Sequence, residues 1–305
     1  MIWLALACGV AEDRSSTTCG GCHPAELEAW ERTGHANGVD GEVLSAWLPE
    51  VRHAWGAGAA QRCVACHAPG WGDEPEVGCL ACHGAVGNLQ EGDGALIVDE
   101  RGPIGARGPT DAPHGVEGRR FLLSSSLCAT CHEVTGPGLL DERTGSEHAE
   151  SGGDEGCADC HMPDGDHDLR PRWEGALALT LTREAGEAVV EVSNVGAGHA
   201  IPTGAAFLRD LRVDLVVDGV AERVLTLVPV PVLEGVQVAL PTDADGFEGE
   251  ALQAGESRVV RVELPDDAEQ VEAVAVFRRF RPDLLEALEL PPGTGGEEQV
   301  VARAY

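Results

Sequence analysis

The chain has 305 residues, which is long enough for two domains with cores of their own. It contains 52 acidic and 21 basic residues, and its formal net charge of -31 argues against nucleic acid and against anionic membrane surfaces as partners. We interpret this charge mainly as a means of keeping the protein soluble. The alternative interpretation is that the acidic surface binds a basic partner protein.

A short apolar segment begins the chain, Met1-Ile-Trp-Leu-Ala-Leu-Ala-Cys8. It is too short to span a bilayer, and it lacks the positively charged start of a complete signal peptide. Small and apolar residues that lead into a cysteine are nevertheless typical of bacterial lipoprotein signals, although Ala5 stands where leucine is usual. We therefore predict that residues 1–18 are a signal remnant and linker, with an outer-leaflet lipid anchor at Cys8. An ordinary cleaved signal and an N-terminus without a targeting role are the alternatives.

One short pattern, Cys-x-x-Cys-His, occurs five times between residues 19 and 161. The copies, here called motifs 1 to 5, begin at Cys19, Cys63, Cys79, Cys128 and Cys157. With 11 cysteines and 11 histidines in the chain, chance would give about 0.01 copies. The pattern is typical of c-type haem attachment, in which two thiols bond to the haem and the following histidine binds its iron.

The motifs therefore predict five covalently bound haem c groups. The predicted attachment residues are Cys19, Cys22, Cys63, Cys66, Cys79, Cys82, Cys128, Cys131, Cys157 and Cys160. The predicted iron ligands of the motifs are His23, His67, His83, His132 and His161. Since c-type haem is attached outside the cytoplasm, we expect an exported protein, either periplasmic or at the cell surface.

Zinc sites, disulfides and a redox dithiol explain the pattern less well. Zinc would pair two Cys-x-x-Cys units and would not need a histidine after every second cysteine. A redox dithiol would normally occur once. Ten of the 11 cysteines belong to the motifs, so that only Cys8 remains and no disulfide is expected within the chain.

Residues 19–170 are predicted to form a mostly irregular and α-helical domain that carries all five motifs. Helices are expected over residues 23–33, where Pro24 suits a first turn, and over residues 42–55. Residues 84–118 are rich in Gly, Pro and Asp and poor in apolar residues, so they would form a poor core by themselves. The haems would supply this core, and the domain should fold only with haem.

Residues 171–305 are predicted to form an antiparallel β-sandwich. Short apolar runs, most of them alternating with polar residues, are separated by Gly, Asp and Pro turns, as in a sandwich of six or seven strands. The expected strands cover residues 176–182, 188–193, 211–217, 224–227, 258–264 and 271–276. Residues 282–290 are expected to form a short helix. This half contains no phosphate loop, nucleophile elbow or zinc-protease motif, and we expect a structural or docking module.

The second ligand of each iron must come from outside the motifs. Methionine is almost excluded, because only Met1 and Met162 exist and Met162 directly follows His161. The histidines outside the motifs are His35, His53, His114, His148, His167 and His199. Five haems and six such histidines indicate His/His ligation, which predicts low reduction potentials. We expect iron to be bound by His35, His114, His148, His167 and His199, and His53 to be unused.

Several segments resemble multihaem cytochromes of the cytochrome c-554-like family. Trp30-Glu-Arg-Thr-Gly-His35-Ala is similar to a family segment whose histidine is a distal haem ligand. Cys66-His67-Ala-Pro-Gly and Cys82-His83-Gly are similar to the second and third attachment sites of that family. The resemblance extends over about residues 19–205 and implies a haem-packed fold, but it does not identify a substrate.

Two further segments extend this resemblance. His148-Ala-Glu-Ser-Gly and the later Cys157-Ala-Asp-Cys160-His161-Met-Pro163 resemble a stretch shared with multihaem nitrite reductases. Asn194-Val-Gly-Ala-Gly-His199-Ala-Ile-Pro-Thr-Gly204 is similar to a segment of larger multihaem cytochromes. In those proteins the histidine reaches a haem from a β domain, which implies the same role for His199.

Electron transfer through closely packed, mostly bis-His, low-potential haems is the function that we favour. The interval of 11 residues between His67 and Cys79 predicts that the haems of motifs 2 and 3 are neighbours. The expected partners are redox proteins, and an oligomer or filament of cytochrome subunits is an alternative.

A second alternative is an oxidoreductase that acts on a small nitrogen or sulfur compound at a five-coordinate haem. The chain has no Cys-x-x-Cys-Lys site, its one tyrosine is the terminal Tyr305, and its acidic surface would repel anions. These features disfavour the catalytic alternative.

Overall fold

The computed structural model describes residues 14–69, 74–90, 92, 94–108, 112 and 114–305. The chain divides into two compact units, and each is described by itself. Unit 1 consists of the described residues of Met1–Leu48, Gly56–Val134 and Asp154–Pro171. Unit 2 consists of Pro49–Trp55, Thr135–Gly153 and Arg172–Tyr305. The predicted anchor at Cys8 lies outside the described residues, and the domain boundaries after residues 18 and 170 stay predictions.

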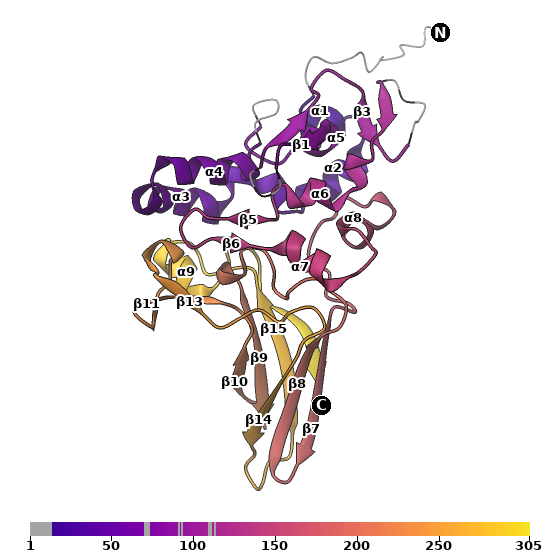
Figure 1. Cartoon of the computed structure of the whole chain (residues 1–305). Coiled ribbons are helices and arrows are strands. Elements are labelled where there is room, and N and C mark those ends of the chain that lie inside the picture. The colour runs from indigo at the N-terminus through magenta and orange to yellow at the C-terminus, as the bar shows by residue number, and fades with distance from the viewer. Residues whose placement is uncertain (1–13, 70–73, 91, 93, 109–111, 113) are drawn as a thin grey trace, which may run out of the picture. The chain divides into compact units, whose positions relative to one another are not determined.

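Unit 1 is built from short helices, turns and small sheets (Figure 1). Its helices are α1 (Ser16–Gly20), α2 (Pro24–Glu31), α4 (Ala57–His67), α5 (Cys79–His83), α6 (Ser125–Ala129) and α8 (Cys157–His161). Its 3-10 turns are η1 (His35–Asp40), η2 (Phe121–Leu123) and η3 (Pro163–Gly165). Strands β1 (Ala85–Asn88) and β2 (Leu96–Val98) pair antiparallel, and β3 (Ile104–Ala106) and β4 (Val116–Gly118) pair parallel.

The predicted helices of this region are confirmed. Helix α2 begins at Pro24, which has no N–H to leave unpaired in the first turn. Helix α3 (Glu42–Trp55), whose two parts belong to different units, matches the expected range of 42–55. The four short strands between residues 85 and 118 were not predicted, because three or four residues carry too little periodicity to be recognised.

The buried apolar side chains in the described part of unit 1 are few, and most of them are alanine. They are Ala29, Val43, Trp47, Ala59, Ala60, Leu80, Ala81, Ala85, Leu127 and Ala129. The large cluster of buried apolar side chains lies instead wholly in unit 2, between Ala176 and Phe277. Unit 1 therefore has the sparse core that its composition led us to expect.

Unit 2 contains an antiparallel β-sandwich, which confirms the predicted fold class (Figure 1). One sheet has the order β10-β9-β15-β16, and the other has the order β14-β8-β7. These strands are β7 (Leu177–Glu184), β8 (Glu187–Asn194), β9 (Asp210–Val217), β10 (Val220–Thr226), β14 (Ser257–Glu263), β15 (Val271–Arg278) and β16 (Gln299–Ala304).

The sandwich forms because alternate residues of the strands are apolar. In β8 every second residue is buried, and Val190 and Val192 pack in one core with Leu211 and Val213 of β9. The six predicted strands are all present, whereas β16 was missed. The short helix predicted over residues 282–290 is α9 (Pro282–Ala287).

Smaller elements complete unit 2. A three-stranded sheet has the order β12-β11-β13. Its strands are β11 (Val230–Leu233), β12 (Val236–Gln237) and β13 (Gly246–Glu248). Strands β5 (Val134–Thr135) and β6 (Asp141–Glu142) form a two-stranded sheet and are followed by α7 (Thr144–Ser151). The 3-10 turns η4 (Ala206–Leu208) and η5 (Pro241–Asp243) also belong to this unit.

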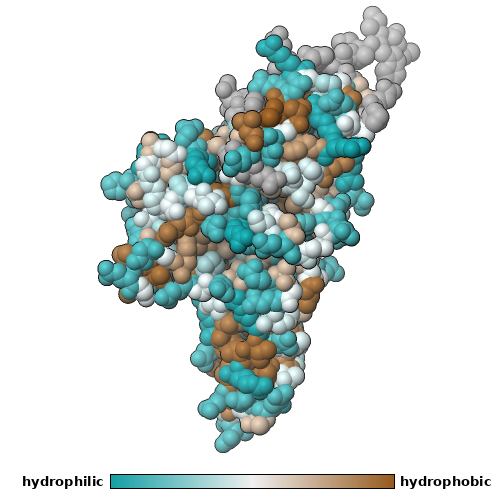
Figure 2. All heavy atoms as spheres, viewed as in Figure 1, coloured by the Kyte–Doolittle hydropathy of each residue, from teal (hydrophilic) through white to brown (hydrophobic). Residues whose placement is uncertain are grey.

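Some hydrophobic side chains of the sandwich are exposed, as Figure 2 shows among its strands. Val220 is 73% exposed and Val259 is 57% exposed. Single exposed valines of this kind are normal on a protein surface. Within the described part of the chain, no helix has the length and apolar character needed to cross a membrane.

Candidate functional site

Each of the five motifs forms a helical turn or lies at the end of a helix. Helices α5 and α8 begin at the first cysteine of their motif and end at its histidine, and α4 ends at His67. In motifs 1 and 4 the histidine N–H donates to the carbonyl of the first cysteine, His23 to Cys19 at 3.0 Å and His132 to Cys128 at 2.9 Å. This turn brings both thiols and the histidine of one motif to one side of the backbone.

The ten motif cysteines are all described and none forms a disulfide. Among the described residues, no group of three or more His, Cys, Asp or Glu side chains is placed to hold a metal ion by itself. In a haem, the porphyrin supplies four of the ligands of the iron and the protein supplies the axial ones.

Three histidines outside the motifs lie opposite three motif histidines within unit 1. The ring centroids of His23 and His114 are 6.2 Å apart. The ring centroids of His35 and His132 are also 6.2 Å apart, and those of His83 and His167 are 5.9 Å apart. The structure thus brings together three pairs of predicted iron ligands that are separated in the sequence.

The spacing of these pairs fits one iron between two imidazoles. For metal–nitrogen bonds of about 2 Å, two imidazoles on opposite sides of one metal have ring centroids about 6 Å apart. The Nδ1 atoms of His114 and His167 are buried and have no hydrogen-bond partner among the residues that the structure describes. Buried polar nitrogens are rarely left unpaired, so both rings have the free capacity that a metal ligand needs.

His35 is held in a neutral state that suits iron binding. Its pKa is lowered to about 4, first by burial and then by the facing imidazoles of His132 and His67. Thr33 holds the backbone of His35 in place, because its hydroxyl accepts a hydrogen bond from the His35 N–H at 3.2 Å. Trp30 donates its indole N–H to the Val77 carbonyl at 3.1 Å, which ties α2 to the segment before motif 3.

His83 is oriented by strand β3. Its Nδ1 lies 2.8 Å from the carbonyl oxygen of Gly105. A carbonyl only accepts hydrogen bonds, so Nδ1 carries the proton and the lone pair of Nε2 remains for a metal. The rings of His83 and His167 are nearly parallel, with an interplanar angle of 14°.

The thiols of different motifs lie close together in unit 1. Cys19 of motif 1 hydrogen bonds to Cys79 of motif 3, and this bond lowers the pKa of the unattached Cys79 thiol to about 7. Cys128 of motif 4 is in the same way hydrogen bonded to Cys157 of motif 5. Motifs 1 and 3 are therefore neighbours, and so are motifs 4 and 5.

Motif 2 also approaches motif 4. The N–H of Gly94 donates to the Thr130 carbonyl at 2.9 Å, and a Cβ added at Gly94 would lie 2.9 Å from the sulfur of Cys66. A side chain at this position would be crowded, which explains a glycine between the two motifs. The predicted proximity of motifs 2 and 3 stays a prediction.

The remaining three non-motif histidines belong to unit 2. His53 is exposed on α3, and His148 lies on α7. His199 lies in the loop after β8, where its Nδ1 is 2.8 Å from the Ala200 carbonyl oxygen, so that its Nε2 also keeps its lone pair. Asn194 stabilises this loop by donating to the His199 carbonyl at 2.8 Å.

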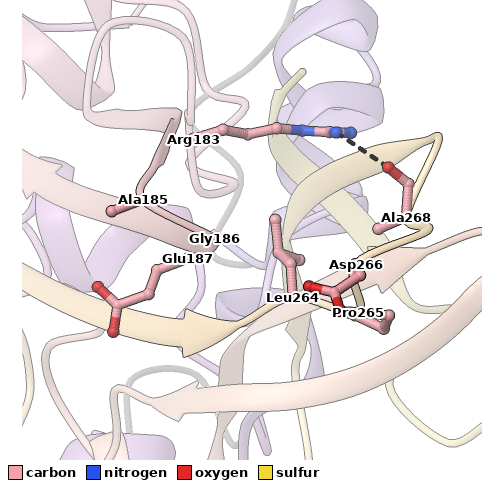
Figure 3. A pocket seen from close by; sticks show the side chains of 8 residues that line it. All are labelled: Arg183, Ala185, Gly186, Glu187, Leu264, Pro265, Asp266 and Ala268. Carbon is pink, nitrogen blue, oxygen red and sulfur yellow. Dashed lines mark hydrogen bonds between the residues drawn. The ribbon is translucent and has the colours of Figure 1, made fainter.

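A pocket of about 260 Å³ opens at the turn between β7 and β8, and it contains none of the predicted site residues (Figure 3). Arg183 lies at its edge, but its guanidinium donates to the carbonyls of Ala268 and Glu269 at 3.2 and 3.0 Å. The donors that could hold an anion are thus largely occupied by the backbone, and we assign no function to this pocket.

No sequence pattern identifies the residues that position these histidines. Arg119 and Gly105 contact His83, and Glu147 contacts the segment that carries His199. Each is a single residue of a common type and lies far along the chain from the histidine that it positions. Only the tertiary structure brings these groups together.

Two comparisons with known proteins concern the family and the fold of the chain. Residues 18–84, which contain motifs 1 to 3, match the family model described as cytochrome c554 and c-prime. The fold is similar to the crystal structure of a penta-haem cytochrome c552 from Thermochromatium tepidum, with a TM-score of 0.75 and 19% sequence identity. That alignment covers 96% of this chain and 98% of the other. The search of curated proteins gives no match. The repeated attachment motifs, the matching family segment and the shared fold support a multihaem c-type cytochrome with covalently bound haem c.

Proposed function

We propose that the chain is a pentahaem electron carrier in which motifs 1 to 5 each hold one haem c. When bound, haem supplies one-electron chemistry at its iron. The cysteines would tether the groups, and the histidines would bind iron from both sides. The redox partners would be other proteins, which deliver and accept electrons.

The three histidine pairs of unit 1 are the observation that carries this proposal. His114 would be the second ligand opposite His23, His35 opposite His132, and His167 opposite His83. His148 and His199 would be the remaining iron ligands. His53 would remain unused. An iron with two histidine ligands has no open position for a substrate, which favours electron transfer over catalysis.

The proximity of the motifs supports transfer between haems. The sulfur contacts between motifs 1 and 3 and between motifs 4 and 5 would hold the attached porphyrin edges close to one another. The Cys82 thiol also acts electrostatically on Cys128, which places motif 3 near motif 4. Such spacing suits a relay in which an electron moves from one haem to the next.

The cellular setting follows from the chemistry of attachment. We propose an exported protein that is periplasmic or at the cell surface, with a lipid anchor at Cys8. The lack of a methionine ligand supports low potentials. The protein could act alone or as a subunit of an oligomer or filament, and its acidic surface would favour a basic partner and disfavour nucleic acid.

Spectroscopy of the mature protein tests the proposal. We expect intact-mass measurement to show five added haems, and electron paramagnetic resonance of the oxidised protein to show low-spin iron only. A high-spin ferric signal that accounts for one haem per chain would contradict it, and would favour a reductase or oxidase with an open iron. Fewer than five haems would contradict the stoichiometry.

A further inference from the structure

Arg119 is a buried cation beside the histidine of motif 3. Its side chain is only 5% exposed, although arginine usually keeps its charged end in water. The guanidinium donates to the carbonyl oxygens of His83 at 3.1 Å, Ala85 at 3.4 Å and Pro103 at 2.5 Å. Its Nε donates to a carboxylate oxygen of Glu117 at 2.6 Å.

These contacts place the charge at the end of helix α5. The carbonyls at a helix C-terminus lack intrahelical partners and carry partial negative charge, so a cation there is favourable. The aliphatic part of Arg119 passes over Gly105, where an added Cβ would lie 2.8 Å from the arginine Cδ and 3.0 Å from the His83 carbonyl oxygen. The carbonyl of Gly105 accepts the hydrogen bond of His83 Nδ1. One arrangement therefore fixes both the imidazole and the guanidinium.

The two charges of the Arg119–Glu117 pair differ in their exposure to water. The side chain of Glu117 is 47% exposed and that of Arg119 is 5% exposed. Water screens the carboxylate more than the guanidinium, so the pair leaves a net positive field at His83.

We propose that Arg119 is a positioning residue that raises the reduction potential of the motif 3 haem, and that Glu117 offsets part of this effect. Reduction adds one electron and lowers the net charge of the iron site by one. A fixed positive charge nearby therefore favours the reduced form. The inference rests on the proposed function, because it needs a haem at motif 3 with His83 and His167 as ligands.

Two substitutions that change the charge in opposite directions test the proposal. In the mature protein, Arg119→Gln should lower one of the five potentials, and Glu117→Gln should raise the same one. We expect about a tenfold change in the reduction equilibrium for Arg119→Gln, which is about 59 mV for one electron. Arg119→Lys keeps the charge and should leave the potential close to that of the parent. Arg261→Gln removes an exposed charge of the sandwich and is the matched control that should shift none.

The haem concerned can be identified in a His167→Ala background, where a high-spin signal should mark motif 3. If His167→Ala converts no low-spin haem to high spin, the proposed function fails at this site. If that response is present but the two charge changes shift no potential, or shift it in the same direction, the role of Arg119 is disproved. Should Arg119→Gln not fold, the expected rise in Glu117→Gln decides alone.

Discussion

Glu147 accepts a hydrogen bond from the hydroxyl of Thr203 at 2.7 Å. The same carboxylate oxygen accepts a hydrogen bond from the N–H of Ala200 at 3.1 Å. Glu147 directly precedes His148 on α7, whereas Ala200 directly follows His199 in the loop after β8. One carboxylate thus connects two segments of unit 2 that each carry a proposed iron ligand.

Removing this carboxylate should loosen both segments. We expect Glu147→Ala to lower the free energy of unfolding by about 1–3 kcal/mol, because partly buried donors lose their acceptor. A high-spin fraction should appear in the oxidised spectrum as the histidines become less well held. Chemical denaturation and electron paramagnetic resonance measure the two effects. Glu150→Ala, which removes a carboxylate that is 69% exposed on the same helix, should show neither effect.

Loss of a proposed ligand should change one haem only. His35→Ala should convert one low-spin iron to high spin, because the ring opposite His132 is removed. The exposed His53 provides the matched control, and His53→Ala should leave the spectrum unchanged. A high-spin signal in His53→Ala, with none in His35→Ala, would reverse our assignment of the two residues.

The fold of unit 1 should depend on haem. Its buried apolar side chains are mostly alanine, which leaves too little apolar surface to stabilise a domain without the cofactor. We expect protein produced without haem attachment to exchange backbone hydrogens rapidly in unit 1 and slowly in strands β8, β9 and β15. Hydrogen exchange followed by mass spectrometry gives this comparison within one molecule. Equal protection of both units would contradict it.

Acid should weaken the β-sandwich through Glu298. Hydrogen bonding to Arg212 first, and then to Arg278, lowers the pKa of Glu298 below its ordinary value of 4.5. The folded state therefore binds a proton less readily than the unfolded state, and this part of the stability is present above pH 4.5 and lost as the pH falls below it. We expect Glu298→Gln to reduce the loss of stability between pH 7 and pH 3, as measured by urea denaturation. The exposed neighbour Glu297, changed to Gln, should keep the dependence of the parent.

The chemistry of attachment and the division into a haem-rich part and a strand-rich part could be predicted from the sequence alone. Cys-x-x-Cys-His is a local pattern, and a strand such as β8 can be recognised from apolar residues at alternate positions, such as Val190 and Val192, which are buried in the structure. Strand β16 was missed because it has no buried residue and shows little alternation.

The pairing of side chains that are distant in the sequence could be seen only in the folded chain. The ring of His83 meets His167, 84 positions further along the chain, and the Arg119 guanidinium meets the same motif through backbone carbonyls that have no sequence signature. The order of neighbouring motifs was equally hidden, since Cys79 lies against Cys19. Such pairings depend on the three-dimensional path of the chain. The spacing of residues along the sequence predicts only contacts between residues that are close in the sequence.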